Sequence, residues 1–112
     1  MSKMSEKQLS KHIQLEASKH GLVLFRNNRG LFLTLDGSRK TRAGLDVNGS
    51  SDFIGWTKEG FFAAVEVKVG YNKPSDAQKL FIENAKNAGG FACCVWSVED
   101  LKKELDLFYR TL

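Results

Sequence analysis

The run of residues 61–69 constrains the fold of this chain more than any other segment. It is rich in aromatic and β-branched residues, which is typical of a β-strand. With period-two alternation its valines, Val65, Val67 and Val69, share one face, and Glu66 and Lys68 share the other. The segment therefore predicts a strand with an apolar face for a core and a carboxylate beside an ammonium group on the opposite face.

A helix and a further strand follow this run. Pro74 near a helix start, together with Ser75 and Gln78 as a capping box, predicts a helix that ends at Gly89 and Gly90. We expect its apolar stripe to contain Ala77, Leu80, Phe81, Ala85 and Ala88. Residues 91–96 are again apolar and β-branched, so the second half of the chain reads as strand, helix and strand.

The remaining segments complete the order of elements. Ser5 and Gln8 form another capping box, which predicts a helix over residues 6–20, and Ser97 caps a last helix. We also expect strands over residues 22–26, 31–35 and 52–56, and an irregular loop over 36–51. Two hairpins would pair residues 22–26 with 31–35 and residues 52–56 with 61–69. The predicted class is α/β, with a mixed α+β sheet, in the order α-β-β-β-β-α-β-α.

Length and composition narrow the class of protein. The 112 residues fit one domain, residues 1–112, and 42% hydrophobic with 27% charged residues is typical of a globular protein. The longest apolar stretch, residues 61–65, is too short to span a bilayer, and residues 1–10 lack the apolar region of a signal peptide. We therefore expect a cytoplasmic protein without a membrane partner. The adjacent Cys93 and Cys94 point to opposite faces of a strand, which predicts core packing.

An aspartate is positioned to join Glu66 and Lys68. Asp52 begins a predicted strand directly after a Gly-Ser-Ser bend, and antiparallel pairing through the turn at 58–60 brings it opposite the far end of the Glu66 strand. Two carboxylates beside an amine form a site suited to Mg²⁺ or Mn²⁺. Taken singly, Asp52 also fits a turn-capping residue, and Glu66 with Lys68 fits a solvated strand face.

The first predicted helix carries a further candidate carboxylate. Glu6 shares the helical arc of Leu9, Ile13 and Ala17, so it is aimed along the face that we expect to meet the sheet. It equally fits a favourable charge in the first turn, at the positive end of the helix dipole.

Phosphodiester cleavage would use these residue types. Metal ions held by carboxylates activate a water molecule and neutralise the charge that builds on the phosphorus centre. A lysine next to the ion can orient or deprotonate the water and stabilise negative charge. Asp52, Glu66 and Lys68 cover these roles.

Several motifs resemble one nuclease family. Asp52, thirteen intervening residues and Glu66-Val67-Lys68 resemble the Asp…Glu-x-Lys signature of the PD-(D/E)XK nuclease superfamily. An ordered set of short motifs is similar, more narrowly, to its virus-type replication-repair nuclease (VRR-NUC) domain: Glu6, residues 25–28 (Phe-Arg-Asn-Asn), 49–52 (Gly-Ser-Ser-Asp), 66–68 and 75–78 (Ser-Asp-Ala-Gln). The matches run from residue 6 to about residue 96 and imply a restriction-endonuclease-like core.

The resemblance also implies an activity. It implies a divalent-metal-dependent, structure-selective DNA endonuclease, acting on branched DNA such as four-way (Holliday) junctions. Similar stand-alone phage and bacterial domains are homodimers, so we expect a homodimer acting in DNA repair in a bacterial or phage-infected cell.

The resemblance assigns roles position by position. Mg²⁺ or Mn²⁺ would be held by Glu6, Asp52, Glu66 and the backbone carbonyl of Val67. Lys68 would be the catalytic lysine. Gln78 matches the family's helix glutamine, close to the catalytic cluster, and would belong to the catalytic set with Asp52 and Glu66.

Positive charge is concentrated in one segment. The whole chain has a formal net charge of +4, whereas residues 19–42 hold six basic side chains against Asp36 alone. A basic segment that leads into a carboxylate cluster is suited to contacts with phosphates. We therefore expect DNA contacts from the following residues: Arg26, Asn28, Arg29, Arg39, Lys40, Arg42 and Lys73.

Other functions also fit the sequence. One is a non-catalytic nucleic-acid-binding module that uses the basic segment 26–42, and another is a structural or interaction domain. The last helix carries an apolar stripe that fits either a dimer face or cover for the domain's own sheet: Leu101, Leu105, Phe108 and Leu112.

Overall fold

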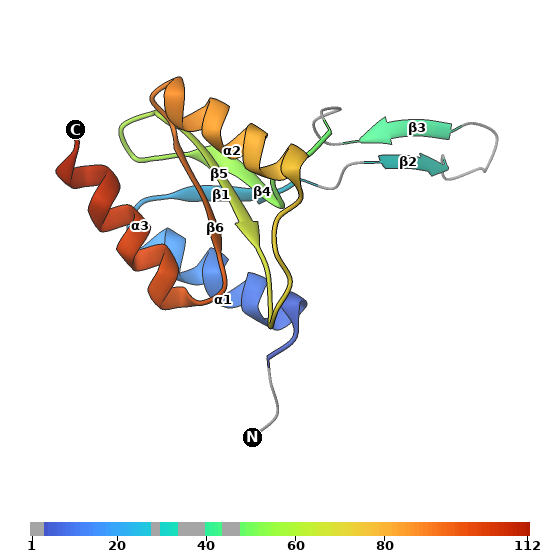
Figure 1. Ribbon diagram of the computed structural model, residues 1–112, viewed down its shortest axis with the longest axis horizontal. Coiled ribbons are helices and arrows are strands. Elements are labelled where there is room, and N and C mark those ends of the chain that lie inside the picture. The colour runs from blue at the N-terminus through green and yellow to red at the C-terminus, as the bar shows by residue number, and fades with distance from the viewer. Residues whose placement is uncertain (1–3, 28–29, 34–39, 44–47) are drawn as a thin grey trace.

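A four-stranded mixed sheet with helices on both faces forms the body of the protein (Figure 1). The structure, a computed structural model, describes residues 4–27, 30–33, 40–43 and 48–112. The elements in chain order are α1 (Glu6–Lys19), β1 (Val23–Arg26), β2 (Gly30–Leu33), β3 (Lys40–Ala43), β4 (Phe53–Trp56), β5 (Phe62–Val67), α2 (Asp76–Asn87), β6 (Phe91–Val95) and α3 (Val98–Arg110). The mixed α/β class predicted from the sequence is confirmed.

The strand order in this sheet is β1-β4-β5-β6. β1 pairs with β4 and β4 with β5 in antiparallel fashion, which confirms the predicted hairpin of β4 and β5. β5 and β6 are parallel, and α2 forms the crossover that a parallel pair requires. β5 is therefore a central strand, with its carboxyl end next to the start of β4.

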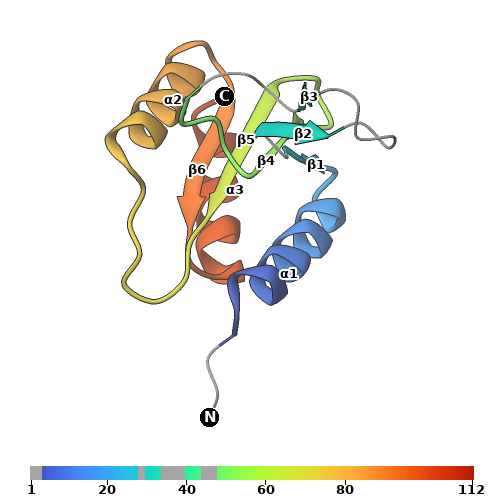
Figure 2. The same ribbon diagram turned by 90° about the vertical axis from the view of Figure 1, so that its right-hand side faces the viewer.

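The two faces of the sheet carry different helices, as Figure 2 shows. The larger core lies on the face covered by α1 and α3, where Val65 and Val67 of β5 are fully buried. On the other face a smaller cluster packs beneath α2 around Ala64, Ile82 and Ala92. Because side chains alternate along β5, Glu66 shares the α2 face with Ala64.

The two adjacent cysteines follow the same alternation. Cys93 packs in the core beneath α1 and α3, and Cys94 packs against the cluster beneath α2. Both thiols are free. The prediction that they fill space on opposite faces of one strand is confirmed.

Both predicted capping boxes are present. The Ser5 hydroxyl accepts a hydrogen bond from the Gln8 backbone N–H at 3.1 Å, and the Gln8 side chain accepts one from the Ser5 N–H at 2.9 Å. Ser75 and Gln78 repeat this pattern at the start of α2. These local bonds fix where α1 and α2 begin.

The apolar stripe of α3 covers the domain's own sheet. Leu101 and Leu105 are buried and Phe108 packs against them, whereas Leu112 is 63% exposed. The stripe therefore serves as cover for the domain's own sheet, which was one of the two interpretations, rather than as a dimer face.

The inner face of α2 differs from the stripe predicted from the sequence. Two residues of the predicted stripe, Phe81 and Ala85, pack against the cluster beneath α2. The buried residue of the helix is Ile82, which was not predicted, and Leu80 is 59% exposed. Ile82 lies four residues after Gln78, so the two share one face of the helix, and the face that buries Ile82 also directs Gln78 toward the sheet.

β1 does not pair with the next extended segment, as the sequence had suggested. Its edge joins β4, with Arg26 opposite Phe53, which places Leu24 in the core. β2 instead pairs with β3 in a separate two-stranded sheet that extends from the body (Figure 1), and β3 lies within the segment 36–51 that was expected to be an irregular loop. The predicted hairpin of residues 22–26 with 31–35 and the predicted irregular loop over 36–51 were both wrong, because strand pairing depends on which edge is free in the folded sheet.

The longest helix, α1, has 14 residues. Within the part of the chain that the structure describes, no helix has the length and apolar character needed to cross a membrane.

Gly55 tests the close pairing of β1 with β4. A Cβ atom at this position would overlap the backbone carbonyl group of Val23. We expect Gly55→Ala to lower the free energy of unfolding by about 3 kcal/mol, because strand backbone must move. Gly60→Ala is the control, since its Cβ meets no atom within 4 Å and only its φ of +94° is unfavourable, so we expect a loss of about 1 kcal/mol. Urea denaturation measures both, and equal losses would contradict the pairing.

Candidate active site

Four of the predicted site residues meet at the carboxyl end of β5. Asp52 directly precedes β4, and Glu66 and Lys68 lie at the end of β5, which is hydrogen-bonded to β4. Gln78 reaches the same place from the first turn of α2. The hairpin thus brings together the aspartate and glutamate that lie fourteen positions apart in the sequence.

Each of the two carboxylates accepts a backbone N–H from the segment that carries the other. The Asp52 N–H donates to Glu66 Oε2 at 3.2 Å, and the Val67 N–H donates to Asp52 Oδ2 at 2.9 Å. These reciprocal bonds hold the acidic side chains side by side at the point where the pairing of β4 with β5 ends.

Lys68 and Gln78 both contact the same oxygen of Glu66. The Lys68 Nζ lies 3.6 Å from Glu66 Oε1, and the Gln78 Nε2 donates to this oxygen at 3.0 Å. Gln78 Oε1 accepts the Ser75 N–H at 2.8 Å, so the capping box directs the amide nitrogen toward Glu66. The capping and catalytic interpretations of Gln78 are therefore compatible.

Glu66 is a buried carboxyl group whose pKa is raised. Its residue surface is only 2% exposed. Burial raises the pKa of Glu66 to about 7, the neighbouring Asp52 carboxylate acts in the same direction, and Lys68 opposes the shift. Below about pH 7 the pair therefore holds a proton, which a bound cation would displace.

Gly49 brings the segment before Asp52 close to α2. Its φ is +84°, and a Cβ atom there would overlap the backbone carbonyl group of Ala77. Glycine satisfies both the backbone conformation and the close approach. The bend that carries Asp52 is consequently packed against the turn that carries Gln78.

Asn27 holds the same bend from the other side. Its Nδ2 donates to Ser50 Oγ and to the Ser51 carbonyl, each at 2.9 Å, and its backbone N–H donates to the Asp52 carbonyl at 2.7 Å. Asn28, the next residue, was predicted to contact DNA, whereas Asn27 was given no role of its own. The available signal was its place in the motif of residues 25–28, which contains both asparagines.

Glu6 is not brought to the carboxylate pair. It is exposed in the first turn of α1, which packs on the face of the sheet opposite to Glu66. Across the described ranges no group of three or more His, Cys, Asp or Glu side chains is placed to hold a metal ion. A role for Glu6 as a metal ligand stays a prediction.

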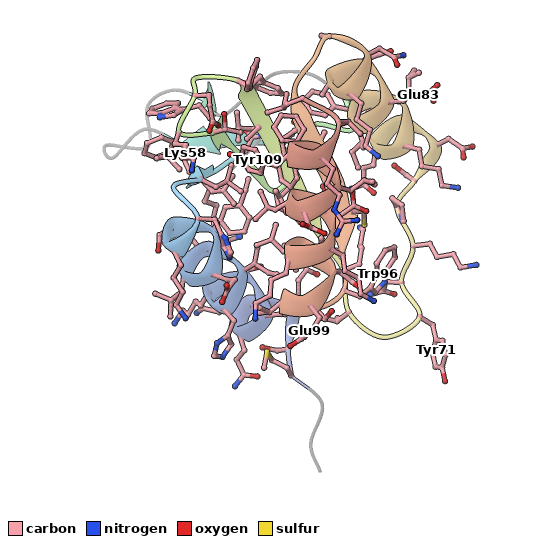
Figure 3. The ribbon with its side chains drawn as sticks, turned by 90° about the vertical axis from the view of Figure 1, so that its left-hand side faces the viewer. Lys58, Tyr71, Glu83, Trp96, Glu99 and Tyr109 are labelled. Carbon is pink, nitrogen blue, oxygen red and sulfur yellow. The ribbon has the colours of Figure 1, made fainter. Side chains whose placement is uncertain are left out.

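The predicted DNA contacts are spread over several elements. Arg26 ends β1, and its guanidinium carbon lies 5.2 Å from the centre of the Phe53 ring. Lys73 is exposed in the connection between β5 and α2, which also carries Tyr71, a side chain that points away from the body in Figure 3. Lys40 and Arg42 belong to β3, and three predicted residues lie outside the described ranges: Asn28, Arg29 and Arg39.

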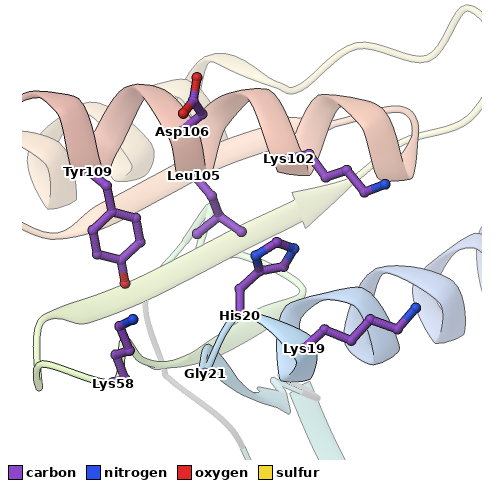
Figure 4. A pocket seen from close by; sticks show the side chains of 8 residues that line it. All are labelled: Lys19, His20, Gly21, Lys58, Lys102, Leu105, Asp106 and Tyr109. Atoms are coloured by element: carbon purple, nitrogen blue, oxygen red, sulfur yellow. The ribbon is translucent and has the colours of Figure 1, made fainter.

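A cavity of about 570 Å³ lies at the other end of the sheet (Figure 4). Lys19 and His20 at the end of α1, Lys58 in the turn between β4 and β5, and Tyr109 of α3 are among its lining residues. Most of its charges have partners: Glu16 contacts both Lys19 and His20, and Arg110 pairs with Asp106. This cavity is separated from the carboxylate pair by the length of β5.

The donor atoms of the pair suit a hard cation. Magnesium is commonly bound through one or two carboxylates, with water and substrate phosphate completing its coordination. Asp52 and Glu66 supply two such groups, and the Val67 carbonyl belongs to the residue whose N–H binds Asp52.

Comparison of the chain with protein-family models, with curated proteins and with solved structures gives no match.

The raised pKa of Glu66 makes stability depend on pH. Between pH 4.5 and about 7 the folded state binds more protons than the unfolded state, so the contribution of Glu66 to the free energy of unfolding falls as pH rises. We expect the free energy of unfolding of Glu66→Gln to rise relative to that of the parent by up to about 1.4 kcal/mol for each pH unit in this window. Urea denaturation with chelator at pH 5 to 8 measures this difference.

Glu83→Gln is the matched control, because it removes an exposed carboxylate from α2. A constant difference between Glu66→Gln and the parent over the whole pH range would contradict the raised pKa.

Proposed function

We propose that this protein is a divalent-metal-dependent DNA endonuclease that hydrolyses phosphodiester bonds, with Asp52, Glu66 and Lys68 at its active site. The observation that carries the proposal is the carboxylate pair, joined by reciprocal backbone bonds, with a lysine ammonium 3.6 Å from Glu66. A solvated strand face would not explain Glu66, which is almost completely buried.

Each residue of the site has a distinct task in this proposal. Asp52 and Glu66 would hold Mg²⁺ or Mn²⁺, with the Val67 carbonyl as a further ligand. The bound ion would supply an activated water molecule and neutralise charge on the scissile phosphate. Lys68 is partly exposed, so its ammonium group can reach substrate and stabilise the negative charge that develops there.

Gln78 positions Glu66 for this task. Because its amide oxygen is held by Ser75, its amide nitrogen faces Glu66 Oε1 and restricts rotation of the carboxylate. The capping box of α2 thereby supports the orientation of a metal-binding oxygen.

The substrate and the place of action come from the motifs. Their resemblance to the VRR-NUC domain supports branched DNA, including four-way junctions, as the substrate. The same resemblance supports a role in DNA repair in the cytoplasm of a bacterial or phage-infected cell.

Cleavage assays test the proposal. We expect the purified protein to cut labelled four-way junctions with Mg²⁺ or Mn²⁺ and not with chelator. Asp52→Asn and Lys68→Met should each lower the single-turnover rate at least about 100-fold, because they remove a metal ligand and a charge-stabilising group. Binding of junction DNA in chelator should survive.

Glu83→Gln and Lys79→Met are matched controls, since both change exposed residues of α2. Metal-independent binding without cleavage by the parent would favour the alternative, a non-catalytic nucleic-acid-binding module. Full activity of the Asp52 and Lys68 variants would overturn the proposed site.

A second copy of the chain is the proposed protein partner, as the resemblance implies. Exposed apolar side chains gather on the α2 face of the sheet: Val23, Phe25 and Trp56, with Phe62 at the boundary, where its ring packs against Phe81 of α2. The rings of Phe25 and Trp56 are 5.3 Å apart and 55% and 49% exposed. Clustered aromatic side chains of this kind are typical of protein interfaces.

Light scattering tests the partner. We expect the parent to have twice the 12.5 kDa mass of one chain, and Phe25→Glu to shift it to the monomer mass because a charge would be buried in the interface. Leu107→Glu is the control, since Leu107 is equally exposed, at 58%, on α3. A monomeric parent, or a dimer unaffected by Phe25→Glu, would contradict this surface.

A further inference from the structure

A polar groove of about 500 Å³ lies between α1 and the end of β1. Its lining comes from one side of α1 and from the last residue of β1: Glu6, Lys7, Ser10, Lys11, Gln14 and Arg26. None of the assignments made above gives Lys7 or Lys11 a role. The groove is on the α1 face of the sheet, separate from the cavity in Figure 4.

The groove is built by packing on both sides. Leu9 and Ile13 face the core, so Lys7 and Lys11 of the same helix lie on its exposed side. Gln14 Nε2 donates to the Leu24 carbonyl at 3.0 Å and ties α1 to the free edge of β1. The helix is thereby held beside Arg26.

The charges of the groove are unbalanced. Three cationic side chains, Lys7, Lys11 and Arg26, line it together with one carboxylate, Glu6. Among the residues that the structure describes, no ion pair joins any of these cations to an acidic side chain. By contrast, Lys19 and His20, which line the cavity in Figure 4, both contact Glu16.

The groove leads to the end of the sheet that carries the carboxylate pair. Arg26 is opposite Phe53, the residue after Asp52, and the next N–H, that of Asn27, donates to the Asp52 carbonyl. Lys7 and Lys11 are one helical turn apart, about 6 Å along the axis, which spans about two phosphates of a DNA strand.

We propose that this groove binds the phosphodiester backbone of a DNA strand, with Lys7, Lys11 and Arg26 contacting successive phosphates on the way to Asp52. The inference rests on the proposed function, because it names the surface along which the substrate of that site runs. Lysine and arginine contacts to phosphates are independent of base sequence, so the groove positions the strand and leaves structure selection to other surfaces.

The test is binding of a fluorescein-labelled four-way junction, followed by anisotropy in chelator over 50 to 300 mM KCl. We expect Lys7→Gln/Lys11→Gln to weaken binding roughly tenfold or more at low salt. It should also lower the magnitude of the log-log salt slope by about 1.8, since each lost phosphate contact on duplex DNA accounts for about 0.9. Thermal unfolding checks that the double variant is folded.

Lys102→Gln/Lys103→Gln is the control, with the same change of charge on exposed lysines of α3. It should leave affinity and slope as in the parent. Equal losses in the two double variants, or none in either, would overturn the groove. If the parent binds as expected but does not cleave with metal, the proposed nuclease activity is wrong while the DNA-binding groove stands. The two failures are therefore distinguishable.

Discussion

Two hydrogen bonds, from the Asp52 N–H to the Glu66 carboxylate and from the Val67 N–H to the Asp52 carboxylate, are the interaction on which the rest of the site depends. A buried carboxylate is unfavourable unless hydrogen bonds and neighbouring charges compensate for the water it loses. Glu66 obtains this compensation from the Asp52 N–H, from Gln78 and from Lys68. Each of these groups is held by the fold, so the fold and the acidic pair support each other.

The surrounding residues make these bonds possible. Gly49 permits the bend before Asp52 to approach the first turn of α2, and Asn27 fixes the same bend to the end of β1. Ser75 orients Gln78. The site thus joins the carboxyl ends of β1 and β5 and the start of β4 to the amino terminus of α2, although its acidic residues come from one hairpin.

The part of this arrangement that is local in sequence could be predicted. Alternation along β5 gave the face of Glu66, the capping boxes gave the starts of α1 and α2, and the turn at 58–60 implied that Asp52 and Glu66 converge. The partner of β1 could not be predicted, because strand pairing joins distant segments. Glu6 was expected on the sheet-facing arc of α1, yet it is exposed in the first turn, and nothing in α1 itself shows which face of the sheet the helix covers.

The carboxylate pair and the cationic groove lie on different faces of the sheet. The α2 face holds the carboxylate pair, and the α1 face carries an unbalanced cationic groove that reaches Arg26 at the end of β1, opposite the start of β4. The most direct test of the central claim is anomalous scattering from crystals of the protein grown with Mn²⁺. If Asp52 and Glu66 hold the metal, we expect an Mn²⁺ peak within about 2.2 Å of a carboxylate oxygen from each of them. Manganese bound elsewhere, with these oxygens still joined only to protein groups, would contradict it.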